Sequence, residues 1–209
     1  ETHPILSSED DFANFELLGE SLFTQSSLPS TMKGSYMRDA LRTGMEMSHS
    51  EGFNPFKYGV IGASDSHNAS SPSDESNYSG KLPLLDGSAG LRTGEALLLP
   101  DGINPVTRWG SGGLAGVWAE ANTRESLFDA LQRKETFATS GPRIGLRFFA
   151  GWGFDETIAE EGDAIALATA GGVPMGGVLQ VDTAQQQSPT FFVWASADWL
   201  SAPLQRIQV

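Results

Sequence analysis

The sequence predicts an α/β domain followed by a β-rich domain, and three features of the chain lead to this fold class. Residues 36–47 carry apolar side chains at helical spacing, and residues 58–63 form a short, continuous apolar run. Such a run is typical of a strand covered on both faces in a mostly parallel sheet. Beyond residue 142 the chain changes to short apolar segments between glycine-rich turns, which indicate strands. We therefore predict two domains, residues 1–142 and 143–209.

The first half of the chain supplies one helix and one strand of the α/β domain. Residues 7–18 open with Ser and acidic residues and predict a short helical turn, and residues 19–34 indicate a loop. A helix is expected from residue 35 until Gly52 and the Asn54-Pro55 pair end it. Together with the 58–63 strand, this helix makes half of a βαβ unit.

Residues 68–94 form a long polar stretch after the predicted strand. A loop of this length in a compact domain is uncommon and is often functional. It either covers a site at the end of the strand or is a surface insertion.

The second half of the chain begins with a small-residue strand over 112–119. A helix follows, for which Asn122 or Thr123 can be the N-cap, with Glu125 placed to complete a capping box. Residues 144–149, 164–168 and 191–195 are expected to be strands. Three tryptophans of this part could form a carbohydrate-binding face, or could lie in the core or an interface, the commoner role: Trp152, Trp194 and Trp199.

The composition restricts the classes of partner. The 209 residues include 26 acidic and 13 basic residues, a formal net charge of −13, and no cysteine. This charge repels nucleic acid and anionic membranes, and no apolar run is long enough to span a bilayer. Because the chain has no cysteine, any bound metal must take oxygen and nitrogen ligands. We expect no nucleic-acid partner and no membrane insertion, and motifs for nucleotide binding or serine-hydrolase chemistry are missing.

Polar side chains follow the 58–63 run, among them Asp65 and His67. In α/β folds ligands collect at the carboxyl ends of strands. A carboxylate oxygen and an imidazole nitrogen from an Asp-x-His pair can bind one cation. Equally, Asp and Ser after a strand commonly form turns or helix caps, and a lone His is commonly a surface residue. The local pattern leaves both interpretations open.

Several segments resemble the domain-of-unknown-function family numbered 3604, which is related to the polymerase-and-histidinol-phosphatase (PHP) metal-dependent hydrolases. The resemblance implies a distorted (β/α) barrel of PHP type followed by a small β-sandwich-like domain. It extends over most of the chain, and the succession of motifs is more specific than any single one. The matching segments are residues 1–4, 11–16, 34–41, 54–68, 116–120 and 138–144.

The resemblance also implies a metal site. Asp65 and His67 correspond to the last Asp-x-His metal motif of the PHP hydrolases, in which zinc, manganese or iron activates water for attack on a phosphoester or related bond. Glu1 and His3 fall where a mid-barrel strand would end and are further candidate ligands. The His-x-His pair that opens PHP sites is missing here, and His49 is expected to be exposed near a helix end. No residue is assigned a catalytic role.

Members of the family are longer, so the resemblance implies that this chain is a carboxyl-side portion with an incomplete metal site. We expect it to associate with itself or with the missing amino-terminal part, because an incomplete barrel leaves sheet edges and apolar surface open. The expected function is part of a phosphoesterase-like hydrolase acting on a small-molecule ester. The alternative is a non-catalytic binding or scaffold module whose Trp-bearing β-domain contacts glycan or protein.

Overall fold

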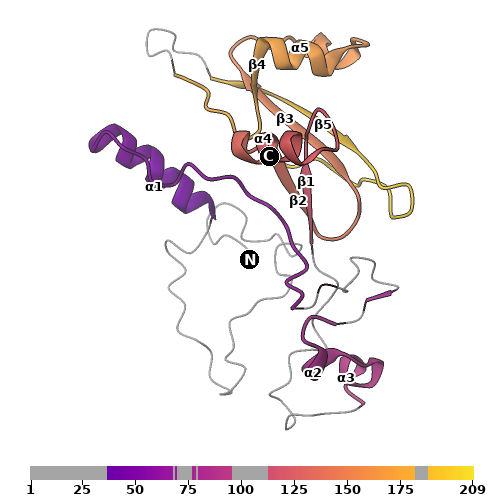
Figure 1. Ribbon diagram of the computed structural model, residues 1–209. Coiled ribbons are helices and arrows are strands. Elements are labelled where there is room, and N and C mark those ends of the chain that lie inside the picture. Colours follow the sequence, from indigo (N-terminus) through magenta and orange to yellow (C-terminus); the bar gives the residue numbers. More distant parts are fainter. Residues whose placement is uncertain (1–36, 68, 70–76, 79, 96–112, 182–187) are drawn as a thin grey trace. The chain divides into compact units, whose positions relative to one another are not determined.

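The computed structural model describes residues 37–67, 69, 77–78, 80–95, 113–181 and 188–209 (Figure 1). The chain divides into two units, and each unit is built from two separate stretches of sequence. The first unit comprises residues 1–57 and 66–111, and the second comprises residues 58–65 and 112–209. None of the helices formed by the described residues is long and apolar enough to cross a lipid bilayer.

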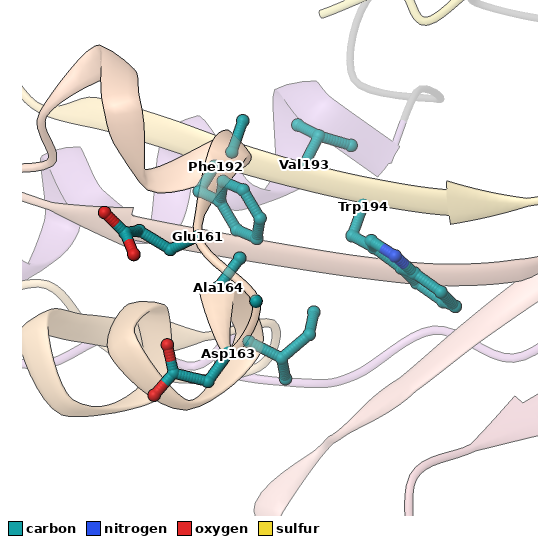
Figure 2. A pocket seen from close by; sticks show the side chains of 9 residues that line it. Glu161, Asp163, Ala164, Phe192, Val193 and Trp194 are labelled. Atoms are coloured by element: carbon teal, nitrogen blue, oxygen red, sulfur yellow. The ribbon is translucent and has the colours of Figure 1, made fainter.

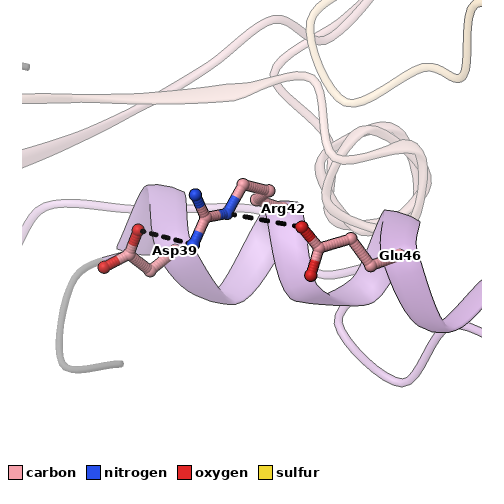
Figure 3. Close-up of polar contacts among 3 residues, drawn as sticks. All are labelled: Asp39, Arg42 and Glu46. Carbon is pink, nitrogen blue, oxygen red and sulfur yellow. Dashed lines mark ion pairs between the residues drawn. The ribbon is translucent and has the colours of Figure 1, made fainter. Parts of the chain in front are cut away.

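The first unit contains α1 (Met37–Ser50), which confirms the helix predicted from residue 35. Gly44 is the buried residue of α1, because the Asn54 side chain lies where a Cβ at this position would be. Asn54 Oδ1 also accepts a 2.8 Å hydrogen bond from Phe56 N–H, which turns the chain after the helix. On the exposed side, Arg42 lies between Asp39 and Glu46, at 3.8 and 3.7 Å (Figure 3).

Two short helices, α2 (Pro83–Asp86) and α3 (Ala89–Thr93), lie in the stretch that was predicted to be a loop. The Ser88 hydroxyl caps α3 by accepting a 3.3 Å hydrogen bond from Leu91 N–H. Gly94 ends the helix in the left-handed conformation, at φ 80°. The loop prediction was therefore wrong for residues 83–93, where capping residues and a terminal glycine support helical turns.

The second unit begins with a two-stranded antiparallel sheet, in which β1 (Leu114–Val117) pairs with β2 (Thr136–Thr139). The helix between these strands is α4 (Arg124–Arg133), as predicted. Thr123 is its N-cap and accepts from Ser126 N–H at 3.3 Å. Ser126, in place of the expected Glu125, reaches back, because its hydroxyl accepts from Ala121 N–H at 3.1 Å.

A three-stranded antiparallel sheet with the order β4-β3-β5 completes the second unit. Its strands are β3 (Gly145–Gly151), β4 (Gly172–Pro174) and β5 (Thr190–Ser196). Phe149 faces Phe192 across β3 and β5, and both pack with Ala168 to form the core cluster. Helix α5 (Ala164–Gly171) and the 3-10 helix η4 (Glu156–Glu160) contribute apolar side chains around this cluster.

The strand predicted over 164–168 was wrong, because these residues form the first turns of α5. Ala and Leu have high helix propensity, and the turn brings Ala164, Ile165 and Ala168 to the side that packs on the core. A short apolar run does not by itself distinguish a buried helix from a strand.

The buried strand predicted over 58–63 was also wrong, since the structure gives these residues no strand and leaves Val60 and Ile61 exposed. The close packing of Gly62 holds this segment against the sheet. A Cβ at Gly62 would lie 2.7 Å from Leu114 O and 3.1 Å from Ala138 Cβ, so the bare backbone packs against β1 and β2. Hydrogen bonds attach it to the sheet, among them one from Gly113 N–H to Ala63 O at 2.9 Å and one from the Thr136 hydroxyl to Val60 O at 2.8 Å.

The strands formed by the described residues belong to these two small antiparallel sheets, and no closed barrel is found among them. The described residues neither confirm nor exclude a PHP-like barrel, which stays a prediction, as does the domain boundary at residue 142.

Candidate functional site

Asp65 lies at the end of the 58–65 segment of the second unit and is exposed. Its φ is 55°, in the left-handed region that non-glycine residues seldom adopt and that Asp tolerates better than most. Two residues before it, Ala63 is attached to β1 through the hydrogen bond from Gly113. Strained backbone of this kind is concentrated at functional sites, which makes Asp65 a candidate on structural grounds as well.

His67 lies in the first unit, where its side chain is exposed. Its backbone N–H donates a 2.8 Å hydrogen bond to the carbonyl oxygen of Lys81. The position of the His67 backbone therefore depends on the short segment around Lys81.

The Asp86 carboxylate organises that segment and is completely buried. Its Oδ2 accepts from Lys81 N–H and its Oδ1 from Leu82 N–H, both at 2.8 Å. The Tyr78 hydroxyl donates to Oδ2 at 3.5 Å, and Arg92 donates to the Asp86 carbonyl oxygen at 2.8 Å. A buried carboxylate is stable only when donors surround it, and here backbone N–H groups supply most of them. Asp86 thereby fixes the backbone to which His67 is attached.

Gly80 allows the chain to pass close to Asp86. Its φ is 95°, and a Cβ at this position would lie 2.5 Å from the Asp86 carbonyl oxygen. Sequence reasoning placed Asp86 only within a polar loop. The available signal was an acid between the apolar Leu84-Leu85 pair and Gly87, at a position that the end of a short helix would bury.

The structure describes some of the predicted site residues and leaves others outside the described residues. Asp65 and His67 are two residues apart in the chain and belong to different units. Glu1 and His3 lie outside the described residues. His49 is exposed in the last turn of α1, as predicted. Among the residues that the structure describes, no group of three or more His, Asp or Glu side chains is placed to hold a metal ion.

One cavity of the second unit, about 330 Å³ in volume, lies beside the core cluster and is lined by Phe192, Val193 and Trp194. Glu161 and Asp163 line it as well, and Figure 2 shows their carboxylates at one end of the lining and the Trp194 indole at the other. Carboxylates and an aromatic face are groups that bind sugar hydroxyls or cations.

A second cavity, about 400 Å³ in volume, lies between β1, β2 and the start of β3. Its lining includes Leu114, Phe137, Thr139, Arg143, Ile144 and Ser196, and no acidic residue contributes to it. Leu114 and Thr139 are also the residues whose carbonyl oxygens lie closest to Gly62. The segment that carries Asp65 therefore packs on two residues that line this cavity.

The cation of Arg147, on β3, lies over the ring of Trp118, the residue that follows β1. Its guanidinium carbon lies 3.8 Å from the centre of the Trp118 ring, and Arg147 faces Trp194 across β3 and β5. Trp118 Nε1 donates a 2.7 Å hydrogen bond to the Leu146 carbonyl oxygen. Trp118 and Arg147 thus have a structural role, whereas Trp199 is 88% exposed.

Comparison with known proteins identifies a family without identifying an activity. No curated protein and no solved structure matches the sequence. A family described as "Protein of unknown function (DUF3604)" matches residues 1–209, which is the whole sequence, and the chain therefore belongs to this family.

Proposed function

We propose that the chain is the carboxyl-side part of a metal-dependent hydrolase of PHP type, which cleaves a phosphoester or related bond in a small-molecule substrate. Asp65 and His67 are proposed as two of the metal ligands. The observation that carries the proposal is the Asp-Ser-His sequence in a chain of this family, at a point where Asp65 adopts a left-handed backbone. Covalent geometry limits two residues at this spacing to about 7 Å between their Cα atoms, a separation that two ligands of one ion can have.

The donor set suits a divalent cation in kind. A carboxylate oxygen and an imidazole nitrogen are the ligands that zinc, manganese and iron accept in the absence of cysteine. Two ligands are too few for a complete metal site, and the described residues contain no group of three or more His, Asp or Glu side chains that could hold a metal ion. Glu1 and His3 are the proposed further ligands, and other parts of the full-length protein would complete the site.

Each proposed ligand has a defined protonation state. Asp65 binds as a carboxylate and His67 as a neutral imidazole, so protons compete with the metal and acid releases it. A bound divalent ion would supply Lewis acidity and lower the pKa of a water molecule. The Asp86 carboxylate contributes by fixing the Lys81 segment, whose carbonyl oxygen holds the His67 backbone.

Metal titration tests this proposal. The purified chain is treated with chelator and then titrated with zinc or manganese by calorimetry, with bound metal measured independently by atomic emission. Asp65→Ala and His67→Ala are expected to weaken binding at least tenfold. His49→Ala and Asp163→Ala, which remove the same groups elsewhere, are expected to bind like the unaltered chain. Equal metal uptake by all of these proteins would rule out the site.

The second candidate function is a non-catalytic module that binds glycan. It is favoured by the 330 Å³ cavity, which combines the Trp194 ring with the carboxylates of Glu161 and Asp163. A sugar ring can stack on an indole while carboxylates accept hydrogen bonds from its hydroxyl groups. Titration of tryptophan fluorescence with a panel of oligosaccharides tests this function. A saturable change that Trp194→Ala abolishes and Trp152→Phe retains would support it, and no change with any sugar would contradict it.

A further inference from the structure

We propose that the 400 Å³ cavity of the second unit binds a small organic anion, with Arg143 as the positive charge and the hydroxyl groups of Thr139 and Ser196 as hydrogen-bond donors. This site goes beyond the proposed hydrolase function and does not depend on a metal ion. Its ligand is a carboxylate or phosphate group attached to a small apolar body.

The charge of the cavity is the first reason. Arg143 is the one charged residue that lines it, in a chain whose formal net charge is −13. Arg143 forms no ion pair within 4 Å with any described residue. Asp198 accepts a hydrogen bond from the Arg143 backbone N–H, and its carboxylate also attracts the Arg143 charge. The guanidinium lies beyond ion-pair distance of it, so the guanidinium donors stay available. Arginine in this state is a preferred partner for carboxylate and phosphate, because its planar donors match their oxygen atoms.

The hydroxyl groups are the second reason. The Thr139 oxygen accepts a 3.2 Å hydrogen bond from Gly141 N–H, so its own hydrogen is left to donate, and no described residue accepts it. The Ser196 hydroxyl makes no hydrogen bond with the described residues. It lies next to Gly145, because a Cβ at Gly145 would be 2.7 Å from the Ser196 hydroxyl oxygen. The cavity therefore offers three donor groups and no carboxylate, which is the donor set of an anion site.

The rest of the lining determines the size and the apolar part of the ligand. Leu114, Phe137 and Ile144 supply hydrophobic surface, and the volume lies in the range of small-molecule sites. The backbone of Arg143 is held at the edge of this cavity by its hydrogen bond to Asp198, and the ring of Pro142 fixes that residue's own φ just before it. A short aromatic or aliphatic acid fits these features.

Calorimetric titration with benzoate and phenyl phosphate tests the proposal, with benzyl alcohol as the neutral probe. The full 209-residue chain is used with chelator present, so that the result is independent of the metal site. Both anions are expected to bind with an affinity that falls as salt is added, and benzyl alcohol is expected to bind much more weakly. Arg143→Gln should reduce anion affinity about 10- to 100-fold, and Thr139→Val and Ser196→Ala about 2- to 10-fold each.

Arg124→Gln is the matched control, because it removes the same charge from an exposed position at the start of α4. It should leave anion binding unchanged. The proposal is overturned if Arg143→Gln binds the anions as tightly as Arg124→Gln does, if benzyl alcohol binds as tightly as benzoate, or if the unaltered chain shows no saturable anion binding. Should Arg143→Gln not fold, as judged by near-ultraviolet circular dichroism, unchanged affinity in Thr139→Val and Ser196→Ala would equally overturn it.

Discussion

The backbone N–H of Arg143 donates a 2.7 Å hydrogen bond to Oδ2 of Asp198. The other oxygen of this carboxylate accepts from Leu200 N–H at 3.0 Å. Gly145 and Ser196 form the last pair of β3 and β5, so Arg143 and Asp198 each lie two residues beyond the sheet. The bond therefore continues the pairing of the two strands into the loop that carries the proposed anion ligand.

The Asp198 hydrogen bonds predict a pH-dependent contribution to stability. They lower the pKa of Asp198 below its ordinary value of 3.8, the Arg143 bond being the largest cause and the Leu200 bond the next. The stabilisation is therefore fully present above pH 3.8 and is lost as the pH falls through the lower folded pKa. We expect Asp198→Asn, which has one acceptor oxygen, to unfold at a lower temperature than the unaltered chain at neutral pH.

Thermal unfolding followed by fluorescence from neutral to strongly acidic pH checks this prediction. The difference between the two proteins should shrink as Asp198 becomes protonated. Asp155, whose pKa is lowered mainly by its bond from Thr157 N–H, is present in both proteins and cancels in the difference. Asp163→Asn is the control, since Asp163 makes no capping hydrogen bond. A difference that stays constant down to the lowest pH would contradict the assignment.

Asp86→Asn is predicted to destabilise the first unit. Both carboxylate oxygens accept backbone hydrogen bonds, from Lys81 and Leu82, so an amide group would place an NH₂ against one of these donors. A buried donor left without an acceptor costs about 1–3 kcal/mol in unfolding free energy. Denaturant unfolding should show this loss, and hydrogen exchange of the Lys81 and Leu82 amides should become faster.

Glu46→Gln is the control for Asp86→Asn. Glu46 pairs with Arg42 at 3.7 Å on the surface of α1, where both side chains are about two-thirds exposed. Exposed pairs at this helical spacing contribute about 0.3–0.5 kcal/mol. An equal loss of stability in both variants would show that burial of Asp86 has no special role.

The sequence was sufficient for elements whose signals are local. The apolar spacing of α1, the Thr123 cap of α4 and the short apolar segment of β3 each lie within a few residues, and these elements were predicted. The 164–168 segment was mistaken for a strand because five apolar residues carry no clear period, and its contact with Phe149 and Phe192 decides in favour of a helix.

The described parts of the candidate sites depended on contacts that no sequence pattern reports. Asp86 is defined by backbone N–H groups that the fold brings to it, and backbone donors look the same in every residue. Arg143 and Ser196 meet at one cavity because of the register of β3 and β5. Asp65 and His67 could be proposed as ligands from the sequence because their spacing in the chain is itself the signal, and this assignment stays a prediction.

Arg147→Met is predicted to weaken the packing between the two sheets of the second unit. The methionine keeps the apolar stem and removes the cation that lies 3.8 Å from the centre of the Trp118 ring. A partly desolvated cation–π contact of this kind contributes about 1–2 kcal/mol. Chemical denaturation should show a loss of this size, with an altered tryptophan emission spectrum in the folded protein. Arg124→Met should unfold like the unaltered chain, and an identical effect of both changes would refute the contact.

Gly62→Ala is predicted to detach the segment that carries Asp65. A Cβ at Gly62 would lie 2.7 Å from Leu114 O and 3.2 Å from Thr139 O, and backbone atoms of a sheet cannot move aside at low cost. We expect a loss of about 1–3 kcal/mol and faster hydrogen exchange at Gly113, whose N–H donates to Ala63 O. Gly153→Ala is the matched control, because no heavy atom lies within 4 Å of a Cβ there, and it should leave the unfolding temperature unchanged. If Gly113 exchanges equally slowly in both variants, the 58–65 segment does not depend on this close approach, and Asp65 is held in place by other contacts.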